Sequence, residues 1–319
     1  MSLTHRLVAL SLTIFAGCAE SPDAPLAAER AYVFSAGWGC PTCTFKNSAY
    51  LGLHPLDDFQ LGSGAPSGYA LVGIEDLAGD MHPVDFSKSA LVAHTPKGDR
   101  SGTDIVDWAL VFELAGAEQR VRVMGFELHP DWTGGDLVPT YALAAEVGPQ
   151  GEVQLESVCP GLSFEETNVV FTPGETYDPV GVTVVPGQPD RVSLACRGHA
   201  VAKLKFLGHD PNDGYGSSVE ARQAALKMLT ADYCGDGTSY TTVGHPLNFE
   251  DDLGLFVPDW YTLPGAMEAR WNEDGAVCLE SPRNTSLARQ DIACADMLPA
   301  CSDKGLDGEL WVSYAPLSP

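Results

Sequence analysis

The sequence has few basic residues and no basic block. Lysine and arginine together number 18, against 43 aspartates and glutamates, and the formal net charge is -25 at pH 7. A chain with this balance repels phosphate groups, so nucleic acid and anionic lipid surfaces are excluded as partners on electrostatic grounds. The acidic excess instead fits a soluble surface or cation binding.

The sequence also lacks an apolar run long enough to span a bilayer. The run Leu7–Ala16 follows the basic Arg6 and is shorter than the roughly 20 residues that a transmembrane helix needs. A short basic region, a short apolar run and then small residues indicate an export signal. We therefore predict a cleaved signal peptide over residues 1–17.

Cys18 comes directly after this signal. The small pair before it is similar to a bacterial lipobox, in which the cysteine is acylated and becomes the mature amino terminus, although Phe15 stands where leucine is usual. A plain signal peptide that leaves Cys18 unmodified is the alternative. Residues 18–30 are rich in Pro, Ala and acid, as expected of a tether. No aspartate follows Cys18, so we expect an exported lipoprotein anchored in the outer membrane, at the cell surface or on the periplasmic face.

Signatures of common cofactor enzymes are missing as well. The sequence contains no Walker loop, no dinucleotide fingerprint and no Gly-x-Ser-x-Gly elbow. No cofactor is therefore expected, with calcium left open below.

Cysteines, in contrast, are plentiful. Of the 9 cysteines, setting Cys18 aside leaves an even number in a compartment where disulfides persist. The pairings that we favour, from closeness in sequence and expected strand neighbours, are Cys40–Cys43, Cys159–Cys196, Cys234–Cys278 and Cys294–Cys301. Cys40 and Cys43 form a C-x-x-C, so redox and metal roles stay open for that pair beside a local bridge.

Short apolar runs separated by Gly, Pro and Asp clusters predict an antiparallel β-rich fold. The clear runs are 69–74, 108–114, 120–126, 141–145, 153–155, 180–185, 191–194 and 200–207. We expect sandwich-like sheets stapled by disulfides, divided into an N-terminal β-rich region over residues 31–158 and a second region over residues 159–319.

One main helix is predicted at about residues 217–233, which makes the fold class α+β. Ser217 and Glu220 have the spacing of a capping box. Ala221, Ala225 and Met228 follow at three- and four-residue spacing, which buries one face.

The stretch Ala231-Asp-Tyr-Cys234 carries the residues that name the ADYC domain, a family of secreted myxobacterial-type proteins. Other motifs of the family are resembled in order, at Cys159-Pro160, Leu194–Lys203, Gly208–Pro211, Glu268–Trp271 and Gly275–Cys278. The resemblance covers residues 159–301 and implies organisation rather than an activity. The family pattern has cysteines where this chain has Leu204 and Ala225, and the joint loss of both predicts that these positions face each other, a strand against the helix, with Cα atoms within about 7 Å.

Cys234 is also the candidate for catalytic chemistry. With Asp232 and His245 nearby in sequence, a cysteine nucleophile of a hydrolase or transferase is one hypothesis. The position after a helix C-terminus disfavours a thiolate there, and the even cysteine count favours a bridge.

The loop with Asp210, Asn212 and Asp213 is superficially similar to a calcium loop. Its glycine comes one residue early for an EF-hand, and an ordinary turn rich in Asp, Asn and Gly is the alternative. From the sequence we expect a non-catalytic binding or structural module that contacts the membrane through its lipid anchor and binds an unidentified protein or glycan, with the cysteine enzyme and a calcium-dependent module as alternatives.

Overall fold

The computed structural model describes residues 32–34, 49–51, 54–63, 69–148, 154–159, 167–178, 180–212, 218–241, 245–256, 265–302 and 310–316. The strands in these ranges are β1 (Tyr32–Phe34), β2 (Tyr50–Leu51), β3 (His54–Pro55), β4 (Phe59–Leu61), β5 (Tyr69–Glu75), β6 (Met81–His82), β7 (Val84–Ser87), β8 (Ala90–Thr95), β9 (Gly98–Ser101), β10 (Ala109–Leu114), β11 (Ala117–Pro130), β12 (Leu137–Val147), β13 (Gln154–Ser157), β14 (Asn168–Asp178), β15 (Thr183–Cys196), β16 (His245–Asp251), β17 (Gly265–Asn272), β18 (Gly275–Leu279) and β19 (Trp311–Pro316). The helices are α1 (Ala200–Phe206) and α2 (Val219–Thr230), and neither is long and apolar enough to cross a membrane. The predicted β-rich character is confirmed.

The larger sheet closes on itself to form a barrel. Its strands follow the order β10-β11-β12-β14-β15-β4-β5, and β5 pairs back with β10. All of these pairings are antiparallel except that of β4 with β5. The expected sandwich is therefore wrong, because the same alternation of apolar and polar residues serves two packed sheets or one closed sheet, and pairings between strands distant in sequence decide which forms.

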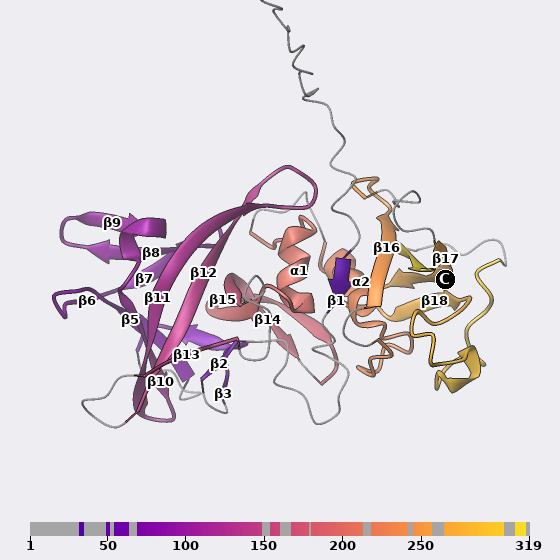
Figure 1. The fold of residues 1–319 in the computed structure, drawn as a ribbon, viewed down its shortest axis with the longest axis horizontal. Helices are drawn as coiled ribbons and strands as arrows, with labels where there is room; N and C mark the ends of the chain where they lie inside the picture. Colours follow the sequence, from indigo (N-terminus) through magenta and orange to yellow (C-terminus); the bar gives the residue numbers. More distant parts are fainter. Residues whose placement is uncertain are drawn as a thin grey trace, which may run out of the picture.

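An apolar core fills the barrel. Phe59 packs against Phe112 with ring centroids 4.9 Å apart, and Tyr141 meets Phe171 edge-on at 5.2 Å. The small sheet β7-β8-β9 lies beside the barrel (Figure 1) and is tied to it where the Leu91 backbone N–H donates to the Tyr141 hydroxyl at 2.9 Å. Burial raises the pKa of that hydroxyl to about 12.

The second sheet has the order β1-β16-β19-β17-β18 and is antiparallel throughout. Figure 1 shows it on the right, with α1 and α2 between it and the barrel. Trp271 and Trp311, which are fully buried, belong to an apolar cluster that also contains Val170 of β14 and Ala195 of β15. One core thus joins the two sheets, and the barrel itself draws strands from both sides of the boundary that we expected between residues 158 and 159.

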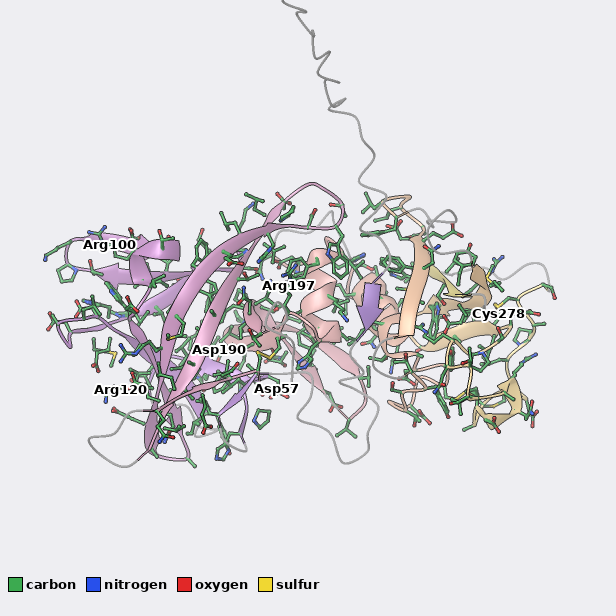
Figure 2. The ribbon with its side chains drawn as sticks, in the orientation of Figure 1. Asp57, Arg100, Arg120, Asp190, Arg197 and Cys278 are labelled. Carbon is green, nitrogen blue, oxygen red and sulfur yellow. A yellow bond between two sulfur atoms is a disulfide. The ribbon has the colours of Figure 1, made fainter. Side chains whose placement is uncertain are left out.

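The segment 200–207, predicted as a strand, is helix α1 followed by a turn. All seven residues of α1 are buried, including Lys203 and Lys205. The alternation of lysines with apolar residues therefore mimics a half-exposed strand, although no face of the helix is exposed. Arg197, just before α1, lies with its guanidinium carbon 5.4 Å from the ring of Phe206 (Figure 2).

The main helix is confirmed but shorter than predicted. Ser218 is its N-cap, and its side chain accepts a hydrogen bond from the Ala221 backbone N–H at 3.1 Å. The N-cap is therefore one residue later than predicted, and Ser217 lies outside the described residues. Leu204 and Ala225 are both fully buried in the same cluster, and α1 packs against α2. The predicted strand against the helix is therefore wrong, because Leu204 lies on α1, and the separation of about 7 Å between the two Cα atoms stays a prediction.

Candidate functional site

The ADYC motif begins where α2 ends. Ala231 has the left-handed conformation, with φ of 52°, and its N–H donates to the Met228 carbonyl at 3.1 Å. The Asp232 N–H donates to the Lys227 carbonyl at 3.0 Å, which closes the last turn. This conformation usually calls for glycine, and here the alanine methyl is buried in the core instead.

Asp232 pairs with Lys227 inside the protein. The Lys227 ammonium donates to Oδ2 of Asp232 at 2.6 Å and to the carbonyls of Gly181 at 2.8 Å and Gly235 at 3.2 Å. Both side chains are almost fully buried. Burial raises the pKa of the Asp232 carboxyl, and the ammonium of Lys227 opposes that rise. No motif in the sequence pointed to Lys227 as the partner of Asp232.

Tyr233 belongs to a second buried polar cluster. Its hydroxyl donates to Oε1 of Glu268 at 2.6 Å, and the same oxygen accepts from Nε of Arg283 at 2.7 Å. Arg283 also donates through Nη2 to the Met228 carbonyl at 2.7 Å, and neither charged side chain has exposed surface. Burial, and then the charge of Glu268, raise the pKa of Tyr233 well above its usual value. The tyrosine ring stacks on Trp271 at 5.2 Å.

The cysteine of the motif is closed in a disulfide. Cys234 bonds to Cys294 and Cys278 bonds to Cys301, so the two pairings that we favoured for these four cysteines are wrong, whereas Cys159 bonds to Cys196 as predicted. Closeness in sequence misled the prediction for Cys294 and Cys301, because each of them bonds to a cysteine more distant in the chain.

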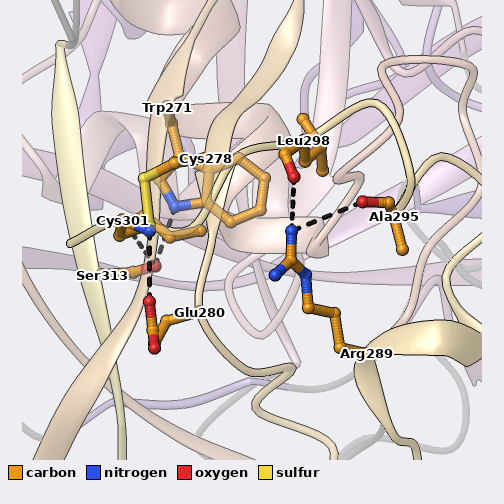
Figure 3. The surroundings of a disulfide bond; sticks show 9 residues. Trp271, Cys278, Glu280, Arg289, Ala295, Leu298, Cys301 and Ser313 are labelled. Carbon is orange, nitrogen blue, oxygen red and sulfur yellow. Dashed lines mark hydrogen bonds between the residues drawn. A yellow bond between two sulfur atoms is a disulfide. The ribbon is translucent and has the colours of Figure 1, made fainter. Parts of the chain in front are cut away.

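The second bridge lies beside a buried tryptophan. In Figure 3, the Cys301 backbone N–H donates to Oε2 of Glu280 at 3.1 Å, and Nε1 of Trp271 donates to the Ser313 hydroxyl at 2.8 Å. Nearby, Arg289 donates to the carbonyls of Ala295 and Leu298, which fixes the turn that carries Cys294.

A sulfur in a disulfide carries no thiolate, so the structure gives the cysteine-nucleophile alternative no support. The backbone of His245 begins β16, and its side chain lies outside the described residues. Cys18, Cys40, Cys43 and Asp213 lie outside them as well.

Two glycines after the motif allow close backbone contacts. A Cβ at Gly235 would lie 1.7 Å from the Asp274 carbonyl oxygen, and one at Gly237 would lie 2.0 Å from that of Val180. Both residues have positive φ. The turn therefore touches the loop between β14 and β15 on one side and the β17–β18 hairpin on the other.

A separate pocket of about 120 Å³ opens between the β7–β8 turn, the β11–β12 hairpin and the end of α1. Its polar wall is an ion pair, in which Nζ of Lys205 donates to Oδ2 of Asp210 at 2.7 Å and to Ser89. The Ser89 hydroxyl donates to the same carboxylate oxygen at 2.5 Å. Leu137, Val138 and Pro139 supply an apolar wall.

Serine, lysine and aspartate in one pocket invite comparison with a serine nucleophile and a lysine base. A lysine base must be neutral, and the adjacent Asp210 carboxylate, whose own pKa is lowered by Lys205 against the effect of burial, favours the ammonium. The cluster is therefore suited to holding its elements together rather than to accepting a proton from Ser89. No sequence signal identified it, since Ser89 and Lys205 are 116 positions apart.

Asp210 and Asn212, our weak calcium candidates, are occupied by other partners. Lys205 takes one carboxylate oxygen of Asp210, and the Asn212 side-chain amide donates to the Pro173 carbonyl at 2.8 Å. Within the described ranges, no group of three or more His, Cys, Asp or Glu residues is arranged to hold a metal ion.

Comparison with known families gives one match. The family model of the ADYC domain matches residues 102–285, which is more than half of the chain. The chain belongs to the ADYC domain family. No curated protein and no solved structure matches it. The matched segment begins between β9 and the barrel strand β10 and ends just after Arg283. It therefore includes the clusters around Asp232 and Tyr233, and it reaches further toward the amino terminus than the motifs in the sequence indicated.

Proposed function

We propose that this protein is an exported cell-envelope lipoprotein that acts as a non-catalytic binding or structural module. The observation that carries the proposal is that every chemically reactive side chain of the ADYC motif has a buried structural partner. Asp232 pairs with Lys227, Tyr233 with Glu268, and Cys234 bonds to Cys294. A motif used in this way favours a role in folding and assembly over one in chemistry.

The disulfides support the exported part of this proposal. Three bridges form among the described residues, and such bonds persist in oxidising compartments rather than in cytosol. Export in turn agrees with the signal and the acylated Cys18 that the sequence predicts.

For a binding role, the pocket beside Lys205 and Asp210 is the concavity that we favour. Asp136 at its rim is exposed, and Ala90 and Val138 offer apolar contact within the pocket. A protein segment or a glycan with hydrogen-bond donors suits such a surface. Calcium at Asp210 would have to displace Lys205, which pairs with this carboxylate.

Intact-mass spectrometry of the protein purified from membranes without reductant tests the proposal. We expect a mature chain that starts at an acylated Cys18, together with no free thiol at Cys234 on alkylation of the unfolded protein. A cytosolic protein with reduced cysteines and no lipid would overturn the proposal. A single free thiol mapped to Cys234 would instead favour the enzyme alternative.

A further inference from the structure

The direction in which the chain enters the fold is set by β1. Tyr32 lies opposite Leu247 and Phe34 opposite His245, in antiparallel register. The amino end of β1 therefore lies toward the carboxyl end of β16, where the strand ends at Asp251. Figure 1 places that end of the sheet on the same side of the molecule as the tip of the β11–β12 hairpin, at the top of the view.

Exposed leucines lie on this same side. Leu253, in the turn after β16, is 54% exposed. At the hairpin tip, Leu128 is 50% and Leu137 is 58% exposed. Across the hairpin, Leu128 pairs with Pro139 and Leu137 pairs with Pro130, so apolar side chains cover one face of the hairpin tip. Tyr141, in the barrel core, lies on the same face of β12 as Leu137 and Pro139. At the hairpin tip this face extends past the core and is exposed to solvent.

We propose that this side of the molecule is a bilayer-facing surface, with the hairpin tip and the β16 turn resting on zwitterionic lipid. The inference rests on the proposed lipid anchor at Cys18. The segment from Cys18 to Tyr32 reaches at most about 48 Å when extended and spans roughly 20 Å as a flexible chain. The anchor thus holds the amino end of β1, and the side on which it lies, close to the membrane.

Charge decides the kind of lipid. The exposed Asp136 and Asp252 lie next to these leucines, and the chain carries a net charge of -25, so an anionic surface is repelled. The contact must come from apolar burial, for which each half-exposed leucine contributes roughly tenfold in partitioning. Because the tether already holds the protein at the bilayer, a small favourable free energy from each leucine is enough to keep the surface in contact with lipid.

Hydrogen exchange of the membrane-purified, full mature protein tests the surface. We expect the backbone amides of residues 128–137 and 252–255 to exchange at least about threefold more slowly on vesicles of zwitterionic phosphatidylcholine than on vesicles of anionic phosphatidylglycerol. Leu155 of β13 is 44% exposed and pairs with Glu146, at the opposite end of β12 from the hairpin tip, so its strand should show no difference.

Variants separate lipid contact from general stabilisation. The pair Leu137→Ser and Leu253→Ser should remove the protection, whereas Leu155→Ser should leave it unchanged. Absence of protection in a protein whose mass shows the acyl chains overturns this inference alone. Absence of the acyl chains overturns the proposed function, and the inference with it.

Discussion

The buried pair of Glu268 and Arg283 gives the strongest test of how the ADYC core is held together. Glu268→Gln keeps the side-chain shape and an acceptor for Tyr233 but removes the carboxylate that pairs with the Arg283 guanidinium. Because neither side chain has exposed surface, the Arg283 charge is left uncompensated inside the protein. We expect the free energy of unfolding to fall by about 3–5 kcal/mol.

The reverse change makes the reasoning specific. Arg283→Met should cost a similar amount, since it leaves Glu268 without its partner. The double variant removes both charges, and it should lose much less than the sum of the two single losses, because the desolvation penalty of each isolated charge disappears. Equilibrium urea unfolding, followed by the fluorescence of Trp271 and its neighbours and by far-UV circular dichroism, measures all three variants.

An exposed pair serves as the matched control. Arg100 and Asp104 lie 3.5 Å apart on the surface, so Asp104→Asn should change stability by less than about 1 kcal/mol. The reasoning fails if Glu268→Gln is no more destabilising than this control, or if the losses of the two single variants simply add in the double variant.

Three further predictions concern stability. Burial lowers the pKa of His209 to about 4 from its usual 6.5, and the charge of Arg222 adds to the effect, so the folded state loses stability as the pH falls from about 6.5 toward 4. In urea unfolding, His209→Phe should raise the free energy of unfolding by about 2 kcal/mol at pH 5 and by little at pH 8. Equal increases at the two pH values would contradict this. Gly235→Ala should lower the free energy of unfolding by more than about 3 kcal/mol or prevent folding, because the new Cβ meets the Asp274 carbonyl. Gly254 also has a positive φ, but nothing lies within 4 Å of a new Cβ there, so Gly254→Ala should cost only about 1 kcal/mol of stability. Equal shifts in melting temperature for the two variants would be the contrary result. Burial raises the pKa of Asp57 to about 6 from its usual 3.8, so the folded state loses stability as the pH rises from about 4 to 6 and gains none of it back above that range. Asp57→Asn should therefore stabilise the protein by about 2–3 kcal/mol at pH 7.5 and by little at pH 4, and a gain independent of pH would exclude this cause.

Local strand signals were reliable because they depend on neighbours in sequence. The runs at 69–74 and 108–114 are within one residue of β5 and β10. Their arrangement was not predictable in the same way. Barrel closure requires β5 to meet β10 and β4 to meet β15, and nothing in the alternation of either strand distinguishes those partners from others.

Burial of charge caused the other failures. Lys205 reads as a solvent-facing residue until its partner Asp210 is placed beside it, and this made α1 look like a strand. Likewise, Asp232 read as a possible member of a catalytic site because Lys227, one helical turn earlier, gives no sign in the sequence of being buried with it. A charged residue is informative about structure only once its counterion is known.

The position of the ADYC turn explains why its four residues carry such different tasks. Lys227, which holds Asp232, also donates to the Gly181 carbonyl in the loop between the barrel strands β14 and β15. On the other side, the Tyr233 carbonyl accepts from the Ala276 N–H of β18, the edge strand of the second sheet. The turn therefore joins helix α2, the barrel and the second sheet through backbone and buried side chains at once. A substitution in this turn should therefore destabilise the barrel and the second sheet together. That behaviour is expected of a structural contact and not of a surface binding site, whose loss leaves the fold intact.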